Sequence, residues 1–469
     1  MRRLFTTTTL YTVAGLIGPL VALLLTPMYI DAIGVAGYGT VDVLQTIVQL
    51  LIPLTLWGVP TTMIGRVPVD ARAPHQYGVL RGAVWLVVLV SILISSAMIG
   101  VAPMVASAMQ RPDVQGLLVI YALSLPFAAV HGVVLVMMRV LGLVWRVVLL
   151  MVTYVGVLAL SRVLLVVWGN AGAYGMIEAL ALTNVVIACL SIGVSWRWWW
   201  GHVDWSMVRQ FGRLGLPLLP ASVAVWMLLF IDRWFLVRHV TPLEQGQYAV
   251  AALVASLMAF VAEPFKQAWQ PIARVRSQAL FARWSLTMYT VVALLVGAVI
   301  VVLAPEVLML LGGRDAVAAS EYLFWLIIAP LLSGTVAIVS MPAIRAQRTV
   351  LLAWATLTGA AVNIALNIVL IPAYGVHGAA WATAGAALII PFVHVWLNHR
   401  IEPITYDWVR VIGLLGLWVV FGLATVSTAL FYRVVAFGVL IVAFGVLIRI
   451  WRWRAWVAVW RGMAQDEHE

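Results

Sequence analysis

The chain has 469 residues, of which 64% are hydrophobic and 10% are charged. The surface of a water-soluble globule needs far more charge, so this composition excludes one and predicts a protein that crosses a membrane many times. The long unbroken apolar runs exclude an outer-membrane barrel, and anionic lipid beside basic loops accounts for the net charge of +11 without nucleic acid.

Apolar runs bounded by Pro, Gly and charged residues predict fourteen membrane-spanning helices, each long enough to cross the hydrocarbon. In chain order the predicted spans are 8–30, 38–65, 80–107, 115–138, 147–168, 174–196, 213–237, 247–270, 284–309, 319–343, 349–371, 376–398, 409–431 and 434–450. The first run follows Arg2 and Arg3 and continues without a cleavage site, so we interpret it as a span and not as a signal peptide.

The connections between the spans are short, and the longest is 197–212. We therefore expect no soluble domain. Most of the 28 Lys and Arg residues fall in every second connection, on the side of the N-terminus. By the positive-inside rule, this distribution predicts that both termini are cytoplasmic.

Two stretches 203 residues apart share one layout. Apolar residues run to Trp168, and Gly169 and Gly172 precede a new apolar helix; similarly, apolar residues run to Ile371, before Pro372 and Gly375. Repeated helical hairpins at a fixed offset are typical of transporters built from two equivalent halves.

Several motifs together resemble the polysaccharide flippases of the multidrug/oligosaccharidyl-lipid/polysaccharide exporter superfamily. The resemblance covers nearly the whole chain and rests on these residues: Thr26-Pro27-Met28-Tyr29-Ile30 with Gly34 and Gly37-Tyr38-Gly39; Gly58-Val59-Pro60 ahead of Arg66; Gly215-Leu216-Pro217-Leu218-Leu219-Pro220 with Trp226 and Asp232-Arg233; and Ile371-Pro372 with Gly375 and Gly378-Ala379-Ala380.

The resemblance implies an all-α membrane protein with two pseudo-symmetric six-helix lobes and two extra helices. The N-lobe would be 1–200, the C-lobe 201–400, and 401–469 would hold the last two spans and a cytoplasmic tail rich in Arg and Trp. A cavity between the lobes, opening alternately to either side, would carry a polyprenyl-diphosphate-linked oligosaccharide across the inner membrane for lipopolysaccharide or exopolysaccharide biosynthesis. We expect a monomer in contact with membrane lipids and polysaccharide-assembly proteins, and no cofactor.

Polar side chains within the spans are the candidates for the substrate path, because such groups are costly in hydrocarbon and tend to face a cavity or a partner. Polar residues three and four apart form one stripe in the second span and another in the eighth. The candidates are Asp42, Gln45, Gln49, Arg162, Asp232, Arg233, Glu263, Lys266, Gln267, Gln270, Asn363 and Asn367.

Different roles are expected of these candidates. Arg162, Arg233 and Lys266 suit a pyrophosphate, and the glutamines and asparagines suit sugar hydroxyls. Snorkelling of Arg162 toward the outer interface and hydrogen bonding of the asparagines between helices are the structural alternatives. His131 and Glu178 are candidates for proton coupling, although a lone buried histidine is more often structural.

We expect no enzymatic activity, because no nucleophile elbow, phosphate-binding loop or metal-ligand motif is present and the single cysteine, Cys189, has no partner. A cation-coupled small-molecule efflux antiporter is an alternative, but it would carry an acidic residue deep in the first span, which is uncharged until Asp31. A peptidoglycan-precursor flippase is disfavoured, because it would carry arginines in the first span and none is present there. A membrane glycosyltransferase or polymerase is disfavoured, because it would carry a sizeable external loop and the connections here are short.

Overall fold

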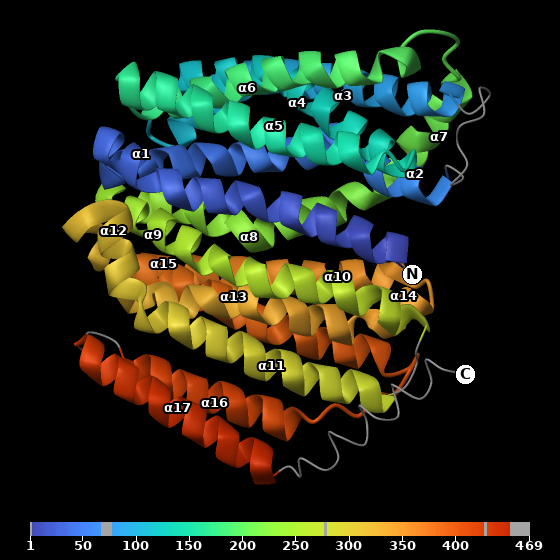
Figure 1. Cartoon of the computed structure of the whole chain (residues 1–469). Coiled ribbons are helices and arrows are strands. Elements are labelled where there is room, and N and C mark those ends of the chain that lie inside the picture. Colours follow the sequence, from blue (N-terminus) through green and yellow to red (C-terminus); the bar gives the residue numbers. More distant parts are fainter. Residues whose placement is uncertain (1, 67–76, 276–278, 426–428, 451–469) are drawn as a thin grey trace. The chain divides into compact units, whose positions relative to one another are not determined.

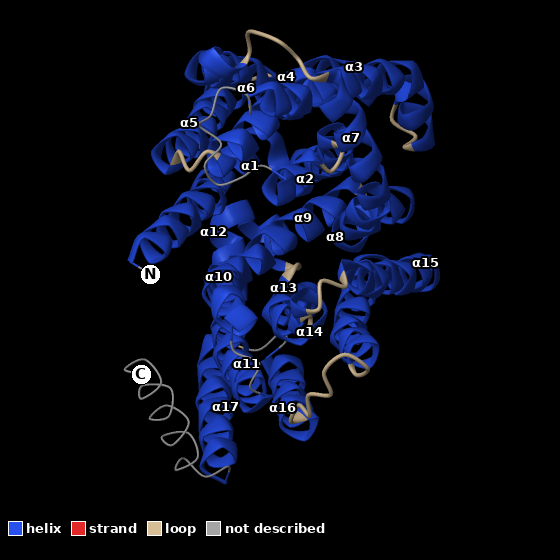
Figure 2. Cartoon of the chain, turned by 90° about the vertical axis from the view of Figure 1, so that its right-hand side faces the viewer, coloured by secondary structure: helices blue, strands red, loops and turns tan. Residues whose placement is uncertain are grey.

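The computed structural model describes residues 2–66, 77–275, 279–425 and 429–450, and every regular element in these ranges is a helix (Figures 1 and 2). Within the same ranges, eleven helices are long and apolar enough to cross a membrane. Two of them, Val13–Leu56 and Val350–Asn398, are interrupted by a non-helical glycine, Gly34 and Gly375. The eleven helices, two of them divided at these glycines, and the shorter apolar helix Leu430–Val446 together account for the predicted spans. They confirm an all-α polytopic membrane protein.

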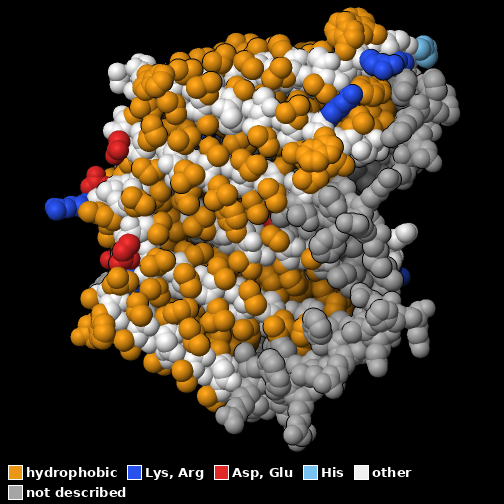
Figure 3. Space-filling model, viewed as in Figure 1, with side chains coloured by type: hydrophobic (Ala, Val, Ile, Leu, Met, Phe, Trp, Pro, Cys, Tyr) orange, Lys and Arg blue, Asp and Glu red, His pale blue; other side chains and the backbone are white. Residues whose placement is uncertain are grey.

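The helices lie in the following order, with single 3₁₀ or π turns joining some of them: α1 (Arg2–Leu56), α2 (Val59–Arg66), α3 (Tyr77–Ala108), α4 (Gln115–Val140), α5 (Val144–Arg162), α6 (Gly172–Ser195), α7 (Trp205–Gly215), α8 (Leu219–His239), α9 (Pro242–Ala255), α10 (Ala259–Val275), α11 (Ala279–Val302), α12 (Ala304–Val317), α13 (Ser320–Val339), α14 (Met341–Arg345), α15 (Thr349–Asn398), α16 (Trp408–Thr425) and α17 (Leu430–Ile450). Apolar side chains cover most of the molecular face in Figure 3, as expected of helices that face lipid.

Contacts divide the chain into two compact units. The first comprises Met1–Val250 and Ala360–Ala382, and the second comprises Ala251–Gly359 and Thr383–Glu469. The first unit therefore contains α1 to α8, the first part of α9 as far as Val250, and the central part of α15. The lobes 1–200 and 201–400 stay a prediction, and each unit is described by itself below.

In the first unit, α4 packs against both α3 and α6. Hydrogen bonds from small polar side chains link these helices. The Ser95 hydroxyl of α3 donates to the Ala122 carbonyl of α4 at 2.6 Å, and the Asn184 amide of α6 donates to the Ser124 hydroxyl of α4 at 3.2 Å. Such bonds between helices replace the water that hydrocarbon does not supply.

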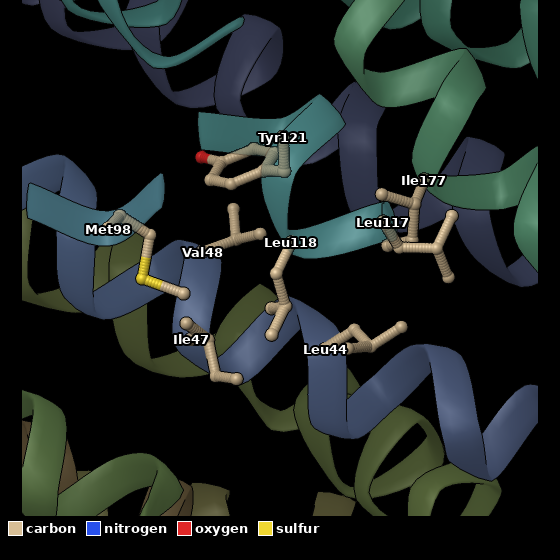
Figure 4. Close-up of a pocket in the computed structure, with 8 residues that line it drawn as sticks. All are labelled: Leu44, Ile47, Val48, Met98, Leu117, Leu118, Tyr121 and Ile177. Carbon is tan, nitrogen blue, oxygen red and sulfur yellow. The ribbon is translucent and has the colours of Figure 1, made fainter. Parts of the chain in front are cut away.

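A small cavity in this unit lies among side chains of α1, α3, α4 and α6 (Figure 4). Its volume is about 10 Å³, the space of one water molecule. Seven of the eight lining residues are apolar; the full lining is Leu44, Ile47, Val48, Met98, Leu117, Leu118, Tyr121 and Ile177. We interpret it as a packing void and not as a substrate site.

In the second unit, α11 packs against α13, α16 and α17. The Phe324 ring stacks on the Trp418 ring with centroids 4.4 Å apart. The Tyr289 hydroxyl donates to the Leu331 carbonyl at 2.6 Å and accepts from the Gly334 amide at 3.3 Å. Aromatic stacking and satisfied hydroxyls together fix the packing of this helix group.

Several predicted boundaries were wrong. The expected loop 197–212 contains most of α7, and the predicted span 38–65 breaks after Leu56, where Trp57 and Gly58 have positive φ. The predicted span 284–309 also breaks, because α11 ends at Val302 and α12 begins at Ala304. Helix-terminating backbone turns therefore divide runs that are apolar throughout.

The two ends of the 203-residue offset show the same backbone feature. Gly172 has φ +64° and Gly375 has φ +54°, values that an L-residue with a side chain rarely adopts. The sequence predicted a turn at both places, and the structure confirms a left-handed glycine at each. The two stretches thus share a glycine with positive φ, but the backbone around it differs: a π-helix and a short loop precede Gly172, whereas Gly375 lies within α15.

Candidate functional site

The candidate site is built around the contact between α1 and α8, which pack against each other within the first unit. The Trp226 indole N–H of α8 donates to the Thr46 carbonyl of α1 at 2.7 Å. Beyond the end of α1, the Trp57 indole N–H donates to the Gly212 carbonyl at 3.0 Å. Two motifs far apart in the sequence are thus brought face to face.

Glycines allow close backbone approach at both ends of this contact. A Cβ on Gly39 of α1 would collide with the backbone of Gly246 in α9, and one on Gly246 would collide with the Val35 carbonyl. At the other end, a Cβ on Gly215 would collide with the Trp57 carbonyl. Any side chain at these positions would push the helices apart.

Between the two ends lies a buried charge group. The Arg233 Nε of α8 lies 3.1 Å from Asp42 Oδ2 of α1, and its Nη1 lies 3.0 Å from Asp232 Oδ1. The Arg233 side chain is 10% exposed, that of Asp42 is 24% exposed and that of Asp232 is 4% exposed. Arg233 therefore joins two carboxylates, one on its own helix and one on α1.

Further bonds hold this group. The Asp232 carboxylate accepts from the Tyr248 hydroxyl of α9 and from the Arg233 backbone amide. Arg233 Nη1 also donates to the Leu229 carbonyl at 3.0 Å. Although adjacent residues of a helix point to different faces, Asp232 and Arg233 form an ion pair because the guanidinium folds back onto its neighbour.

Arg162 has a different environment. Its guanidinium carbon lies 5.9 Å from the centre of the Tyr29 ring, and Tyr38 and Tyr154 lie within electrostatic reach. Its Nε has no hydrogen-bond partner, and no ion pair to it is formed among the residues that the structure describes.

A π-helical turn at Val163–Trp168 follows Arg162 directly. Such turns are rare and frequently mark functional sites, because they shift the register of the helix. Here the turn separates the arginine from the left-handed Gly172 and the start of α6.

The other polar stripe lies in the second unit, on α10. Lys266 pairs with Glu263 one turn before it, so its charge is matched within its own helix. Gln267 is half-buried, and Gln270 is exposed. On α1, Gln45 is half-buried and Gln49 exposed, so both stripes run from a paired charge to an exposed amide.

The two asparagines of α15 are 1% and 0% exposed. The Asn367 amide donates to the Asn363 carbonyl oxygen at 3.0 Å, while Asn363 Nδ2 and Asn367 Oδ1 have no hydrogen-bond partner. These atoms are buried in this conformation, and their expected contact with sugar hydroxyls stays a prediction.

The coupling candidates are separate from the Arg233 group. His131 Nδ1 lies 2.9 Å from the Ser191 hydroxyl, and its ring stacks on Tyr154 with centroids 5.5 Å apart. Glu178 is half-buried on α6. Among the described ranges, no three His, Cys, Asp or Glu side chains are placed to hold a metal ion.

Sequence reasoning missed two tyrosines at the site, Tyr154 and Tyr248. Each lies in an apolar run, where a tyrosine is expected to be an ordinary core residue. The spacing of Tyr154 eight residues before Arg162, two full turns on one helical face, was the only available signal.

An ion pair joins the first turns of α12 and α17. Arg433 is hydrogen-bonded to Glu306 through Nη1 at 2.9 Å and Nη2 at 2.6 Å, and it also donates to the Val302 carbonyl. The hydrogen bonds from Arg433 lower the pKa of Glu306 below its ordinary value. Glu306, to which no role was assigned from the sequence, thus helps to anchor α17 to α12.

Comparisons with known proteins identify a family from the sequence and a fold from the structure. The model of a family described as polysaccharide biosynthesis protein matches residues 4–274. Among curated proteins, none matches the sequence.

Solved structures resemble the fold over nearly its whole length. The lipid II flippase MurJ in an inward closed conformation is 12% identical, with a TM-score of 0.73 over 94% of this chain and 98% of that one. A multidrug resistance MATE family transporter of the MOP superfamily, in an inward-facing conformation, is 14% identical, with a TM-score of 0.64 over 84% of this chain and 98% of that one. The MATE multidrug transporter DinF-BH, solved as a complex, is 16% identical, with a TM-score of 0.63 over 86% of this chain and 96% of that one. At these identities the likeness establishes the fold.

Proposed function

The chain belongs to the family of polysaccharide biosynthesis proteins, and we propose that it is a flippase for a polyprenyl-diphosphate-linked oligosaccharide in the cytoplasmic membrane. The observation that carries this proposal is the family match over residues 4–274, which includes both α1 and α8. The transporter fold of the structural neighbours supports movement of a substrate and not its chemical conversion.

The pairing of the intramembrane cations supports a specific place for the diphosphate. Arg233 is matched by Asp42 and Asp232, and Lys266 is matched by Glu263. A matched cation attracts an incoming anion weakly, because its own carboxylate competes for the same donors. Arg162, which forms no such pair among the described residues, is the cation that we assign to the diphosphate.

The tyrosines around Arg162 fit that role. Phenolic hydroxyls donate to phosphate oxygens, and the aromatic rings hold the guanidinium plane without neutralising it. Tyr29 is 2% exposed and Tyr38 is half-buried on the same helix, and we place both rings in one wall on α1. The headgroup would cross beside this wall while the polyprenyl tail stays in the bilayer.

Alternating access would use the contact of α1 with α8 and α9. In the proposed lobes, α1 belongs to the N-lobe and α8 and α9 to the C-lobe. The glycine contacts close both ends of this interface, and the Arg233 group lies between them. Opening one glycine contact at a time would admit the headgroup from one side only.

The proposal is tested with Arg162→Ala and Arg162→Lys in proteoliposomes that contain the lipid-linked oligosaccharide. Losing a charge-assisted bond of about 1.5 to 3 kcal/mol predicts roughly a ten- to hundredfold weaker apparent affinity for the alanine variant. Lysine should restore part of it, since it keeps the charge but loses the planar fork.

The matched control is Arg111→Ala, an exposed arginine in the same unit. Rates are normalised to folded protein, and lipid II and a cationic dye are offered as competing substrates. Full flipping by Arg162→Ala would overturn the assignment of the diphosphate to Arg162. Transport of the dye alone would favour the efflux antiporter.

A further inference from the structure

Four tryptophans are exposed at one end of the first unit, the end that the predicted topology makes cytoplasmic. Trp145 in the first turn of α5 is 71% exposed, Trp196 and Trp200 after α6 are 55% and 63% exposed, and Trp205 at the start of α7 is 61% exposed. The boundary between lipid headgroups and acyl chains accommodates both the apolar body of an indole and its N–H group. A lipid surface is therefore the cover that suits this end of the unit.

The helix α7 has one apolar face and one basic face. Phe211 is 3% exposed, and with the half-buried Val208 it belongs to the core that α7 shares with α3. Trp205, Arg209 and Arg213 follow at intervals of four residues and are all exposed, so they lie on the other face. Figure 3 shows Lys and Arg side chains among hydrophobic ones at the end of this unit where α7 lies. A helix divided in this way is typical of the plane of a membrane surface.

Two further arginines flank the turn between α6 and α7. The Arg81 guanidinium of α3 donates from Nη1 to the His202 carbonyl at 3.2 Å, and a Cβ on Gly201 would collide with that guanidinium. The Arg146 guanidinium carbon of α5 lies 5.8 Å from the centre of the Trp198 ring. Guanidinium groups from two different helices thus lie against the same short turn.

The charges of these arginines are not neutralised within the part of the chain that the structure describes. Arg81, Arg146, Arg209 and Arg213 form no ion pair there, and the Arg81 Nε atom is buried without a hydrogen-bond partner. The carboxylate of Asp204, which precedes α7, is engaged in capping that helix. Unpaired guanidinium donors bind phosphate oxygens strongly, and beside exposed indoles the matching phosphate is that of a lipid headgroup.

We propose that the α7 surface, formed by the turn 196–202, the exposed face of α7, Arg81 and Arg146, binds an anionic phospholipid of the adjoining leaflet. Arg81 and Arg146 hold the headgroup phosphate, and the exposed tryptophans lie beside the glycerol and the acyl chains. The occupant is a membrane lipid and not the transported substrate, because this surface lies on the outside of the helix group and away from Arg162.

Binding of the lipid would act on α7 as a whole. At the other end of this helix, the Gly212 carbonyl accepts from the Trp57 indole, and a Cβ on Gly215 would collide with the Trp57 carbonyl. A lipid that fastens α7 to the membrane surface therefore stabilises the contact of α7 with the end of α1.

The first test measures lipid binding to the full-length protein in detergent. Native mass spectrometry compares phosphatidylglycerol with phosphatidylcholine of the same acyl chains, and we expect the wild type to retain phosphatidylglycerol preferentially. Arg81→Gln and Arg146→Gln should each weaken its binding about fivefold, the effect of one arginine beside an anionic lipid surface. Arg111→Gln is the matched control, since it removes an exposed arginine beyond the opposite end of α3 and should leave binding unchanged.

Equal retention of the two phospholipids by the wild type would overturn the proposal. Unchanged phosphatidylglycerol binding in Arg146→Gln would also overturn it. Displacement of the lipid by inorganic phosphate at equal concentration would mean that the arginines hold a free anion, which would reject the lipid as occupant. Thermal unfolding identifies a variant that fails to fold; if Arg81→Gln does so because it loses its bond to His202, Arg146→Gln decides the outcome.

The second test measures the effect on α7 and needs no substrate. Hydrogen exchange is followed in phosphatidylcholine nanodiscs with and without phosphatidylglycerol. Phosphatidylglycerol should slow exchange of the amides of α7 in the wild type and in Arg111→Gln, and it should have no such effect in Arg146→Gln combined with Arg209→Gln. Exchange in α4 should be the same under both conditions. No slowing in the wild type, or equal slowing in the double variant, would contradict lipid binding at the α7 surface.

Discussion

Burial determines what each charged residue contributes to this protein. Arg233 is a buried cation whose removal leaves two carboxylates without their partner, whereas Arg111 is 37% exposed and pairs with Asp113, which is 40% exposed. Breaking a buried pair costs about 3 to 5 kcal/mol, and an exposed pair contributes about 0 to 1 kcal/mol. The same substitution should therefore have unequal effects at the two positions.

We expect Arg233→Ala to lower the free energy of unfolding by about 3 to 5 kcal/mol and Arg111→Ala by about 1 kcal/mol or less. Thermal unfolding in detergent, followed by intrinsic tryptophan fluorescence, compares the two variants at neutral pH. Adding Asp42→Asn to Arg233→Ala should recover part of the loss, because it removes one of the stranded charges. Equal midpoints for Arg233→Ala and Arg111→Ala would contradict this account.

At the scale of single elements, α17 is fastened to α12 by a titratable bond. The pKa of Glu306 is lowered by its hydrogen bonds from Arg433, so the stability that this pair supplies is present above the ordinary value of 4.5. It is lost as the pH falls through the lowered value, where Glu306 is protonated in the folded protein.

The difference in thermal midpoint between the wild type and Glu306→Gln should therefore be largest near neutral pH and shrink toward zero on acidification below about pH 4. Thermal scans of both proteins at a series of pH values measure it. In an Arg433→Met background the same substitution should give no pH-dependent difference. A difference that grows on acidification would contradict the role of this bond.

The helix α7 shows which elements the sequence could not predict. Asp204 caps this helix, accepting from the Ser206 amide at 2.9 Å and from the Met207 amide at 3.4 Å, and the Ser206 hydrogen bonds lower the pKa of Asp204. Its polar face made residues 197–212 read as a loop, because hydropathy detects helices that are apolar throughout. The long apolar spans were predictable because their hydropathy is high throughout. The turns at Gly172 and Gly375 were predictable because glycine readily adopts a positive φ.

For the molecule as a whole, sequence reasoning predicted an all-helical membrane protein and several of the polar residues that meet, but not their pairing. Asp42 and Arg233 are 191 residues apart, and no periodicity links them. The pairing depends on how α1 packs on α8, which is decided by glycines and indole hydrogen bonds at other positions. The same holds for the tyrosines around Arg162.

Substituting glycines at opposite ends of the α1 contact should bias the protein in opposite directions. Gly246→Ala would force α9 away from the Val35 carbonyl, and Gly215→Ala would force the end of α7 away from the Trp57 carbonyl. With Gln45→Cys as reporter in a Cys189→Ser background, a membrane-impermeant thiol reagent should label faster from the Gly246 end in the first variant and from the Gly215 end in the second.

Labelling from both sides of oriented vesicles measures this bias. Gly100→Ala, where a Cβ would meet nothing, is the matched control. Equal changes on both sides in the two variants would argue against gating at these contacts.

The glycine contacts also constrain how this chain can diverge over evolution. At Gly39 and Gly246 backbone meets backbone, so an added methyl group has no flexible side chain to displace. Gly58 is restricted for two reasons. Its φ of +66° disfavours any residue with a side chain, and a Cβ added there would press against the Cα of Gly215. A mutational library selected for growth should therefore accept few replacements at these glycines, although none of them is assigned to the headgroup. The lipid-facing leucines around them should accept many apolar replacements.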